Sequence, residues 1–71
     1  MTRPEKHSLT LQGHRTSVSL EPEFWQEFRH IARKEGTTLN DLAARIDDTR
    51  GDTGLASAIR VYVLHALRPK A

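Results

Sequence analysis

The stretch Arg15-Thr16-Ser17-Val18-Ser19-Leu20 decides the fold of this 71-residue chain. Its side chains alternate between polar and apolar, which predicts a β-strand with one buried face. No comparable strand follows it, and a lone strand cannot satisfy its own backbone N–H and C=O groups. The sequence therefore predicts an obligate dimer, in which the same strand of a second copy completes an antiparallel ribbon.

The alternation also assigns each strand side chain to a face, because successive side chains point to opposite sides. The side chains expected to face the core are Thr16, Val18 and Leu20. The side chains expected to face outward are Arg15, Ser17 and Ser19. The opposite register would bury Arg15. A two-stranded ribbon with a short polar row fits the major groove of DNA, so this row is a candidate nucleic-acid surface.

Upstream of the strand, residues 1–12 are expected to be a loose or partly extended arm. Leu9 and Leu11 alternate with polar residues, and the parity of the apolar positions changes after Gly13. Such a switch at a glycine indicates a bulge or a tight turn. Either the strand starts early and is bulged, or Ser8–Gln12 folds back as a short extra strand; the sequence leaves both open.

Downstream, residues 13–68 are predicted to form a single domain with a strand at about 15–20 and helices at about 22–35, 38–48 and 55–67. Pro22 suits the first helical position, and Gly36 suits a left-handed cap at the end of that helix. Thr38 and Asp41 have the spacing of an approximate capping box, which starts the second helix. The third helix is apolar on most sides, which in so short a chain again indicates a partner subunit.

Composition excludes several classes of protein. The chain has no cysteine, so disulfides and thiolate metal sites are excluded, and its histidines lack metal-ligand spacing. The net charge is only +2, but both ends are basic and the middle is acidic. No apolar run is long enough to span a membrane, and the first residues lack a signal-peptide core. We expect a cytoplasmic, nucleoid-associated protein with no cofactor, no metal and no catalytic residues.

Several linked motifs carry a family resemblance. They are Gly13-His14-Arg15-Thr16-Ser17-Val18-x-Leu20-Glu21-Pro22-Glu23-Phe24-Trp25, Leu39-Asn40-x-Leu42, Ile46-Asp47 and Leu55-Ala56-Ser57-Ala58-Ile59-Arg60-Val61-Tyr62-Val63-Leu64. In this order the chain resembles the ribbon-helix-helix DNA-binding proteins of the Arc and MetJ class, and most closely a bacterial subgroup of short members. The resemblance covers residues 13–64.

The resemblance implies a mainly α fold with one N-terminal strand, an intersubunit antiparallel ribbon, an extra C-terminal helix and double-stranded DNA as partner. It implies that Arg15, Ser17 and Ser19 read base edges. The expected phosphate contacts are His14, Thr38, Leu39 and Asn40. The expected dimer core is Thr16, Val18, Leu20, Phe24, Phe28, Ile59, Tyr62 and Val63. Residues 55–67 are the alternative counterpart of the family's second helix, although the Thr38 cap favours 38–48.

The sequence thus favours a small bacterial transcriptional regulator that acts as a homodimer. Ser17 and Ser19 discriminate weakly between bases, which leaves a low-specificity architectural DNA binder open. The other alternative is a protein-interaction or antitoxin-like dimer with an unidentified protein partner. Only Pro69-Lys70-Ala71 follows the expected domain at 13–68, which is short for a segment that wraps a toxin.

Overall fold

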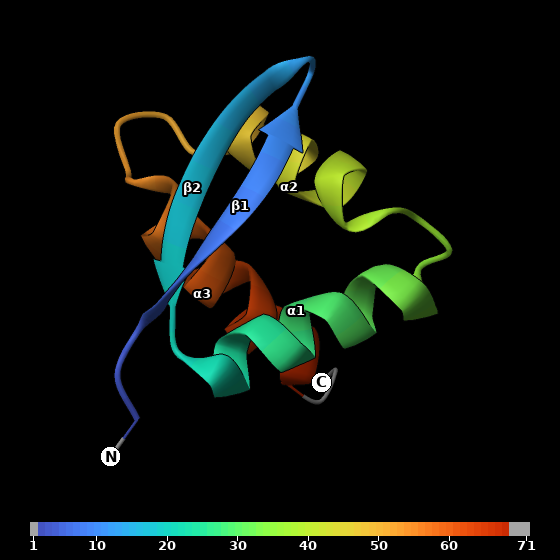
Figure 1. Cartoon of the computed structure of the whole chain (residues 1–71). Coiled ribbons are helices and arrows are strands. Elements are labelled where there is room, and N and C mark those ends of the chain that lie inside the picture. Colours follow the sequence, from blue (N-terminus) through green and yellow to red (C-terminus); the bar gives the residue numbers. More distant parts are fainter. Residues whose placement is uncertain (1, 69–71) are drawn as a thin grey trace.

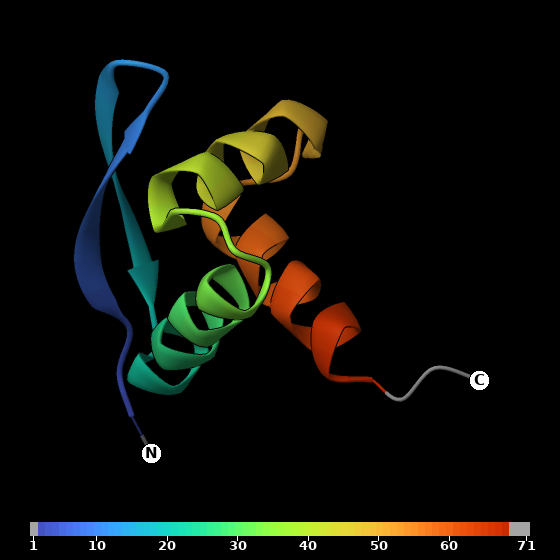
Figure 2. The same ribbon diagram turned by 90° about the vertical axis from the view of Figure 1, so that its right-hand side faces the viewer.

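The computed structural model describes residues 2–68, and within them the chain forms two strands followed by three helices (Figure 1). The elements are β1 (Glu5–Leu11), β2 (His14–Leu20), α1 (Pro22–Lys34), α2 (Leu39–Thr49) and α3 (Leu55–Leu67). The strands form an antiparallel hairpin on one side of the three helices (Figure 2). This order confirms the ribbon-helix-helix fold class with an extra C-terminal helix.

The prediction of a single strand is wrong, because β2 has a partner strand within its own chain. β1 pairs with β2 along the whole of both strands, from Glu5 opposite Leu20 to Leu11 opposite His14. Residues 5–11, expected in a loose or partly extended arm, therefore belong to the ribbon, and the fold-back alternative holds. The physical reason is that the odd-numbered Leu9 and Leu11 can be buried beside the even-numbered Val18 and Leu20 only when the chain reverses between them.

The reversal is a two-residue turn at Gln12 and Gly13. Both residues have positive φ, 52° for Gln12 and 83° for Gly13. Positive φ at both central residues is what a type I′ hairpin turn requires, and this turn matches the right-handed twist of the strands. Glycine adopts such a conformation without steric cost, which explains why the change of parity occurs at Gly13.

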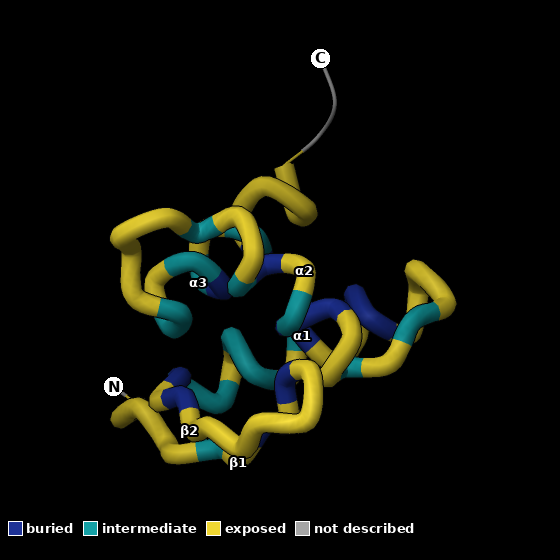
Figure 3. The backbone as a smooth tube through the Cα atoms, turned by 90° about the horizontal axis from the view of Figure 1, so that it is seen from above, coloured by how far each residue is buried: buried dark blue, intermediate teal, exposed yellow. Residues whose placement is uncertain are grey.

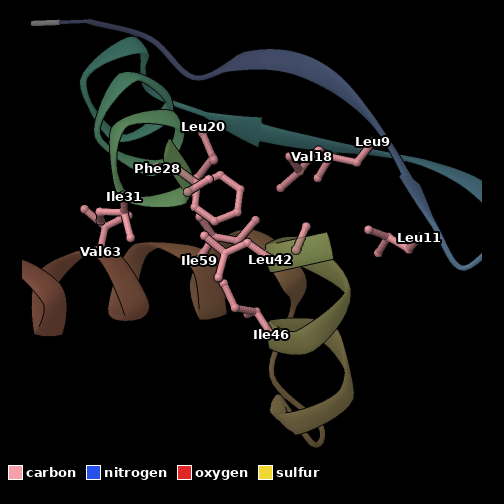
Figure 4. Close-up of a cluster of buried hydrophobic side chains, with 12 residues drawn as sticks. Leu9, Leu11, Val18, Leu20, Phe28, Ile31, Leu42, Ile46, Ile59 and Val63 are labelled. Carbon is pink, nitrogen blue, oxygen red and sulfur yellow. The ribbon is translucent and has the colours of Figure 1, made fainter. Parts of the chain in front are cut away.

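One apolar core lies between the hairpin and the helices (Figure 4). Its buried members are Leu9, Leu11, Val18, Leu20, Phe28, Ile31, Ala32, Leu42, Ala43, Ile46, Ile59 and Val63. Every described element supplies at least one of them. Most of the length of both strands is nevertheless exposed (Figure 3), because only alternate side chains of the hairpin reach this core.

Three of the residues expected in the dimer core are not buried within the single chain. Thr16 is exposed, although alternation places it on the same face of β2 as Val18. Phe24 and Tyr62 are only half-buried. Thr16 borders an open hollow together with Ala44, Arg50 and Leu55, so its side chain stays exposed although Leu9 opposite it is buried.

The remaining residues expected in a dimer core are buried within one chain. Val18, Leu20, Phe28, Ile59 and Val63 are all at most 4% exposed. Their burial therefore requires no second copy, because β1 and α3 supply the apolar surface that a partner was expected to supply.

Local signals in the sequence set the helix ends. Gly36, at φ 71°, follows α1. Its N–H donates to the carbonyl of Arg33 at 3.1 Å, and the N–H of Thr37 donates to the carbonyl of Ala32 at 3.0 Å. This pair of bonds is a Schellman motif. At the start of α2 the Thr38 hydroxyl accepts from the Asp41 N–H at 3.1 Å, which satisfies one of the free N–H groups there.

A carboxylate at the end of α1 links three helices. Tyr62 on α3 donates its hydroxyl to Glu35 Oε2 at 2.6 Å, and Arg45 on α2 contacts Glu35 Oε1 at 2.9 Å. The hydrogen bond from Tyr62, followed by that from Arg45, lowers the pKa of Glu35 below its usual 4.5. Burial and, to a smaller extent, the hydrogen bond to Glu35 raise the pKa of Tyr62 above its usual 10.0.

Replacement of Glu35 by glutamine should make folding less sensitive to acid. A carboxyl whose pKa is lowered by folding stabilises the folded state above its unfolded pKa, and this contribution disappears as the pH falls through the folded pKa. The wild type should therefore lose thermal stability below about pH 4.5 more steeply than Glu35→Gln. Melting temperatures between pH 6 and 3 measure this, with Glu5→Gln as the control on an exposed carboxyl. Parallel curves for all three proteins would contradict the role of Glu35.

Candidate nucleic-acid interface

The face of the hairpin that points away from the helices consists of polar side chains. Three cross-strand pairs form it: Lys6 with Ser19, Ser8 with Ser17 and Thr10 with Arg15. All six residues are exposed. We call these six residues the outer face of the hairpin. They offer hydrogen-bond donors at every position and acceptors at four, which is the chemistry needed to contact base edges and phosphates.

The structure brings together the three residues that the sequence suggested as base readers. Arg15, Ser17 and Ser19 lie on the outer face as expected from alternation. The other half of this face, which β1 supplies through Lys6, Ser8 and Thr10, was not predicted from the sequence. The sequence pattern that could have indicated these residues is the alternation of Ser8 and Thr10 with Leu9 and Leu11. This alternation is typical of a strand with one buried and one exposed face.

The start of α2 holds the edge of β1. The side-chain oxygen of Asn40 accepts a hydrogen bond from the backbone N–H of Thr10 at 3.0 Å. Because Thr10 is opposite Arg15, this bond places the first turn of α2 beside the turn end of the outer face. Thr38 caps the helix there and is exposed, while Leu39 is half-buried against the core. The structure thus gathers the expected phosphate residues of α2 next to the base-reading row.

A residue of α3 holds the other end of the ribbon. Arg60 donates from Nε to Glu21 Oε1 at 3.0 Å and from Nη2 to the Ser19 carbonyl at 3.3 Å. Its guanidinium also lies 5.9 Å from the centre of the Phe24 ring. The hydrogen bond from Arg60 lowers the pKa of Glu21, which keeps this carboxylate charged. Arg60 therefore fixes the junction of β2 and α1, 39 or more residues away in the chain.

An aromatic contact fixes β1 against α1. The ring of His7 stacks on Trp25 with ring centres 3.9 Å apart and an angle of 5° between the planes. Trp25 in turn lies against Phe28 at a centre distance of 6.2 Å. Together with the bonds from Asn40 and Arg60, this stack orients a hairpin that would otherwise be held only by its four buried apolar side chains.

His14 lies apart from the base-reading row. Alternation places it on the helix-facing side of β2 with Thr16, whereas Arg15 points the other way. It borders a shallow hollow at the turn end, together with Leu11, Asp47 and Arg50. Asp47 and Arg50 in this hollow form a salt bridge at 2.6 Å, and the phosphate contact expected for His14 stays a prediction.

Two other kinds of site find no support in the part of the chain that the structure describes. Among residues 2–68, no three histidine, aspartate or glutamate side chains gather closely enough to hold a metal ion. Over the same residues, no helix combines the length and apolar character that crossing a bilayer demands.

Comparison with known proteins agrees with the architecture. Searches of the curated proteins and of the solved structures found no match. The model of one family, described as a ribbon-helix-helix domain, matches residues 4–67 and so includes both strands and all three helices. Domains of this family are generally non-enzymatic DNA-binding modules that act as dimers, and the family suggests a DNA-binding regulator. Over nearly its whole length, this chain belongs to the ribbon-helix-helix domain family.

Proposed function

We propose that this protein is a small bacterial transcriptional regulator that inserts its hairpin into the major groove of double-stranded DNA. The observation that carries the proposal is the outer face, whose six side chains are all polar and all exposed. The major groove is about 12 Å wide and admits a two-stranded ribbon. In one chain β1 and β2 form a two-stranded ribbon that carries this face.

In this proposal Arg15 makes the main sequence-specific contact. Its guanidinium can donate two parallel hydrogen bonds to guanine, whereas Ser17 and Ser19 accept or donate to several bases. Thr10 and Lys6 extend the row on β1. Thr38, Leu39 and Asn40 place the start of α2 beside it, where free backbone N–H groups suit a phosphate. No step of this function involves a catalytic residue, a metal or a cofactor, and the site of action is the chromosome in the cytoplasm.

The protein is proposed to act as a homodimer, as its family generally does. Five of the eight residues expected in the dimer core are already buried in one chain, so the contact would use residues that remain exposed. Val61, Leu64 and Leu67 on α3 are 48–57% exposed and carry no charge. This exposed apolar surface supports a contact between two copies through α3. It equally supports the second candidate function, a module that docks on a different protein.

A salt titration of DNA binding tests the proposed function. Fluorescence anisotropy with a random duplex and with duplexes from the region upstream of the gene should detect binding that weakens as salt rises, because phosphate contacts release counterions. Preference for one upstream duplex supports a regulator, and equal affinity for all supports a low-specificity architectural protein. Absence of binding at low salt, by a protein shown to be folded, rejects the proposal and favours the protein-docking module.

A further inference from the structure

Two arginines, Arg29 and Arg33, form a basic row on the exposed side of α1, next to the edge of β1. Trp25, Arg29 and Arg33 are four residues apart, so they follow one another along one flank of the helix. The first of them, Trp25, stacks on His7 of β1, which places this flank on the β1 side of the molecule. Figure 2 shows that side, with β1, α1 and the start of α2 toward the viewer. Arg29 and Arg33 are both exposed and, with Gln26 and His30, line a shallow groove.

The charges of this row are not neutralised within the described chain. Of residues 2–68, the arginines that form salt bridges are Arg45, Arg50 and Arg60. The nearby carboxylates are engaged elsewhere or face away. Glu23 accepts from Thr2 at 2.8 Å, Glu27 borders the hollow between α1 and α3, and Glu35 is held by Tyr62 and Arg45. The row therefore presents two positive charges to solvent beside the ribbon.

We propose that Arg29 and Arg33 bind the phosphate backbone that borders the major groove on the β1 side of the inserted hairpin. This inference rests on the proposed function. When a ribbon occupies the groove, a sugar–phosphate backbone passes along each of its edges. Along the β1 edge it meets the first turn of α2 at Thr10 and, farther along, the flank of α1 that starts at Trp25. The exposed flank of the first helix thus becomes part of the DNA-binding surface, which spans more phosphates than the ribbon and α2 alone.

The test is the salt dependence of DNA binding by the double variant Arg29→Gln/Arg33→Gln. Loss of two phosphate contacts should reduce the slope of log K against log salt by about 2. The factor by which affinity falls between 50 and 200 mM salt should then be roughly tenfold smaller for the variant than for the wild type. The loss of affinity relative to the wild type should be equal on random and upstream duplexes, because phosphates carry no sequence information. Circular dichroism and melting temperature check that the variant is folded.

The matched control is Lys34→Gln/Arg68→Gln, which removes the same net charge from residues that lie on the α3 side and at the end of α3. Its slope should stay close to that of the wild type. An equal loss of slope in both double variants would mean that only overall charge matters, and this would overturn the inference. If the wild type binds DNA and Arg29→Gln/Arg33→Gln shows the same salt slope, the inference about Arg29 and Arg33 is overturned. The proposed function is left intact by that result. A wild type that binds no duplex at all would reject both.

Discussion

Replacement of Phe28 by alanine should remove most of the stability of this protein. Phe28 is 0% exposed and packs at the centre of the core, between the hairpin and the helices (Figure 4). Truncation of a buried phenylalanine costs about 3–5 kcal/mol, because transfer free energy is lost and a cavity remains. A chain of this size has a total free energy of unfolding of only roughly 4–10 kcal/mol. We therefore expect the variant to lose roughly half or more of its free energy of unfolding.

Thermal and urea unfolding followed by circular dichroism measure this effect. Each kcal/mol lost should lower the melting temperature by about 4–8 °C in a domain of this size. The control is Gln26→Ala on the exposed side of the same helix, which should change stability by less than about 0.5 kcal/mol. A loss below about 1 kcal/mol for Phe28→Ala would mean that the core is not organised around this ring.

Replacement of Arg15 by alanine should have the largest effect of any single substitution on DNA recognition. A bidentate contact from arginine to guanine contributes about 1–3 kcal/mol of discrimination, so affinity for the preferred duplex should fall roughly 5- to 150-fold. Affinity for a random duplex should fall much less, which relaxes specificity at one base position. Arg15 is exposed and forms no salt bridge within residues 2–68, so the fold should be unaffected.

Two further variants separate base reading from simple charge. Arg15→Lys keeps the charge but replaces the rigid guanidinium fork by a flexible ammonium group, so it should bind random duplex normally and lose part of its preference for the specific one. Arg68→Ala removes one positive charge at the end of α3, away from the hairpin, and should lower affinity slightly on every duplex. If Arg15→Ala behaves like Arg68→Ala on all duplexes, Arg15 is not a base-reading residue.

The sequence predicted the parts of the fold that depend on neighbouring residues. Alternation in 15–20 correctly placed Val18 and Leu20 inside and Arg15, Ser17 and Ser19 outside. Pro22, Gly36 and Thr38 predicted helix ends within one residue of those in the structure. These features follow from φ preferences, capping bonds and side-chain periodicity, which act over a few residues and can be read directly from the chain.

The candidate site could be predicted only in part, because half of its ribbon comes from a strand with a weaker pattern. Lys6, Ser8 and Thr10 join the outer face only because β1 pairs with β2. The flank of α1 that carries Arg29 and Arg33 becomes part of a candidate surface only because Trp25 stacks on β1. Neither relation is encoded in a local motif.

The sequence by itself thus determined the elements, their ends and the two faces of β2. Tertiary structure alone decided which strand completes the ribbon, since a strand can pair with its neighbour or with another copy and its own residues do not distinguish the two. It also decided that Thr16 stays exposed and that Arg60 and Asn40 hold the hairpin at its two ends. The physical reason is that burial and these hydrogen bonds join residues 30 to 41 positions apart, and they exist only after the chain has folded around its core.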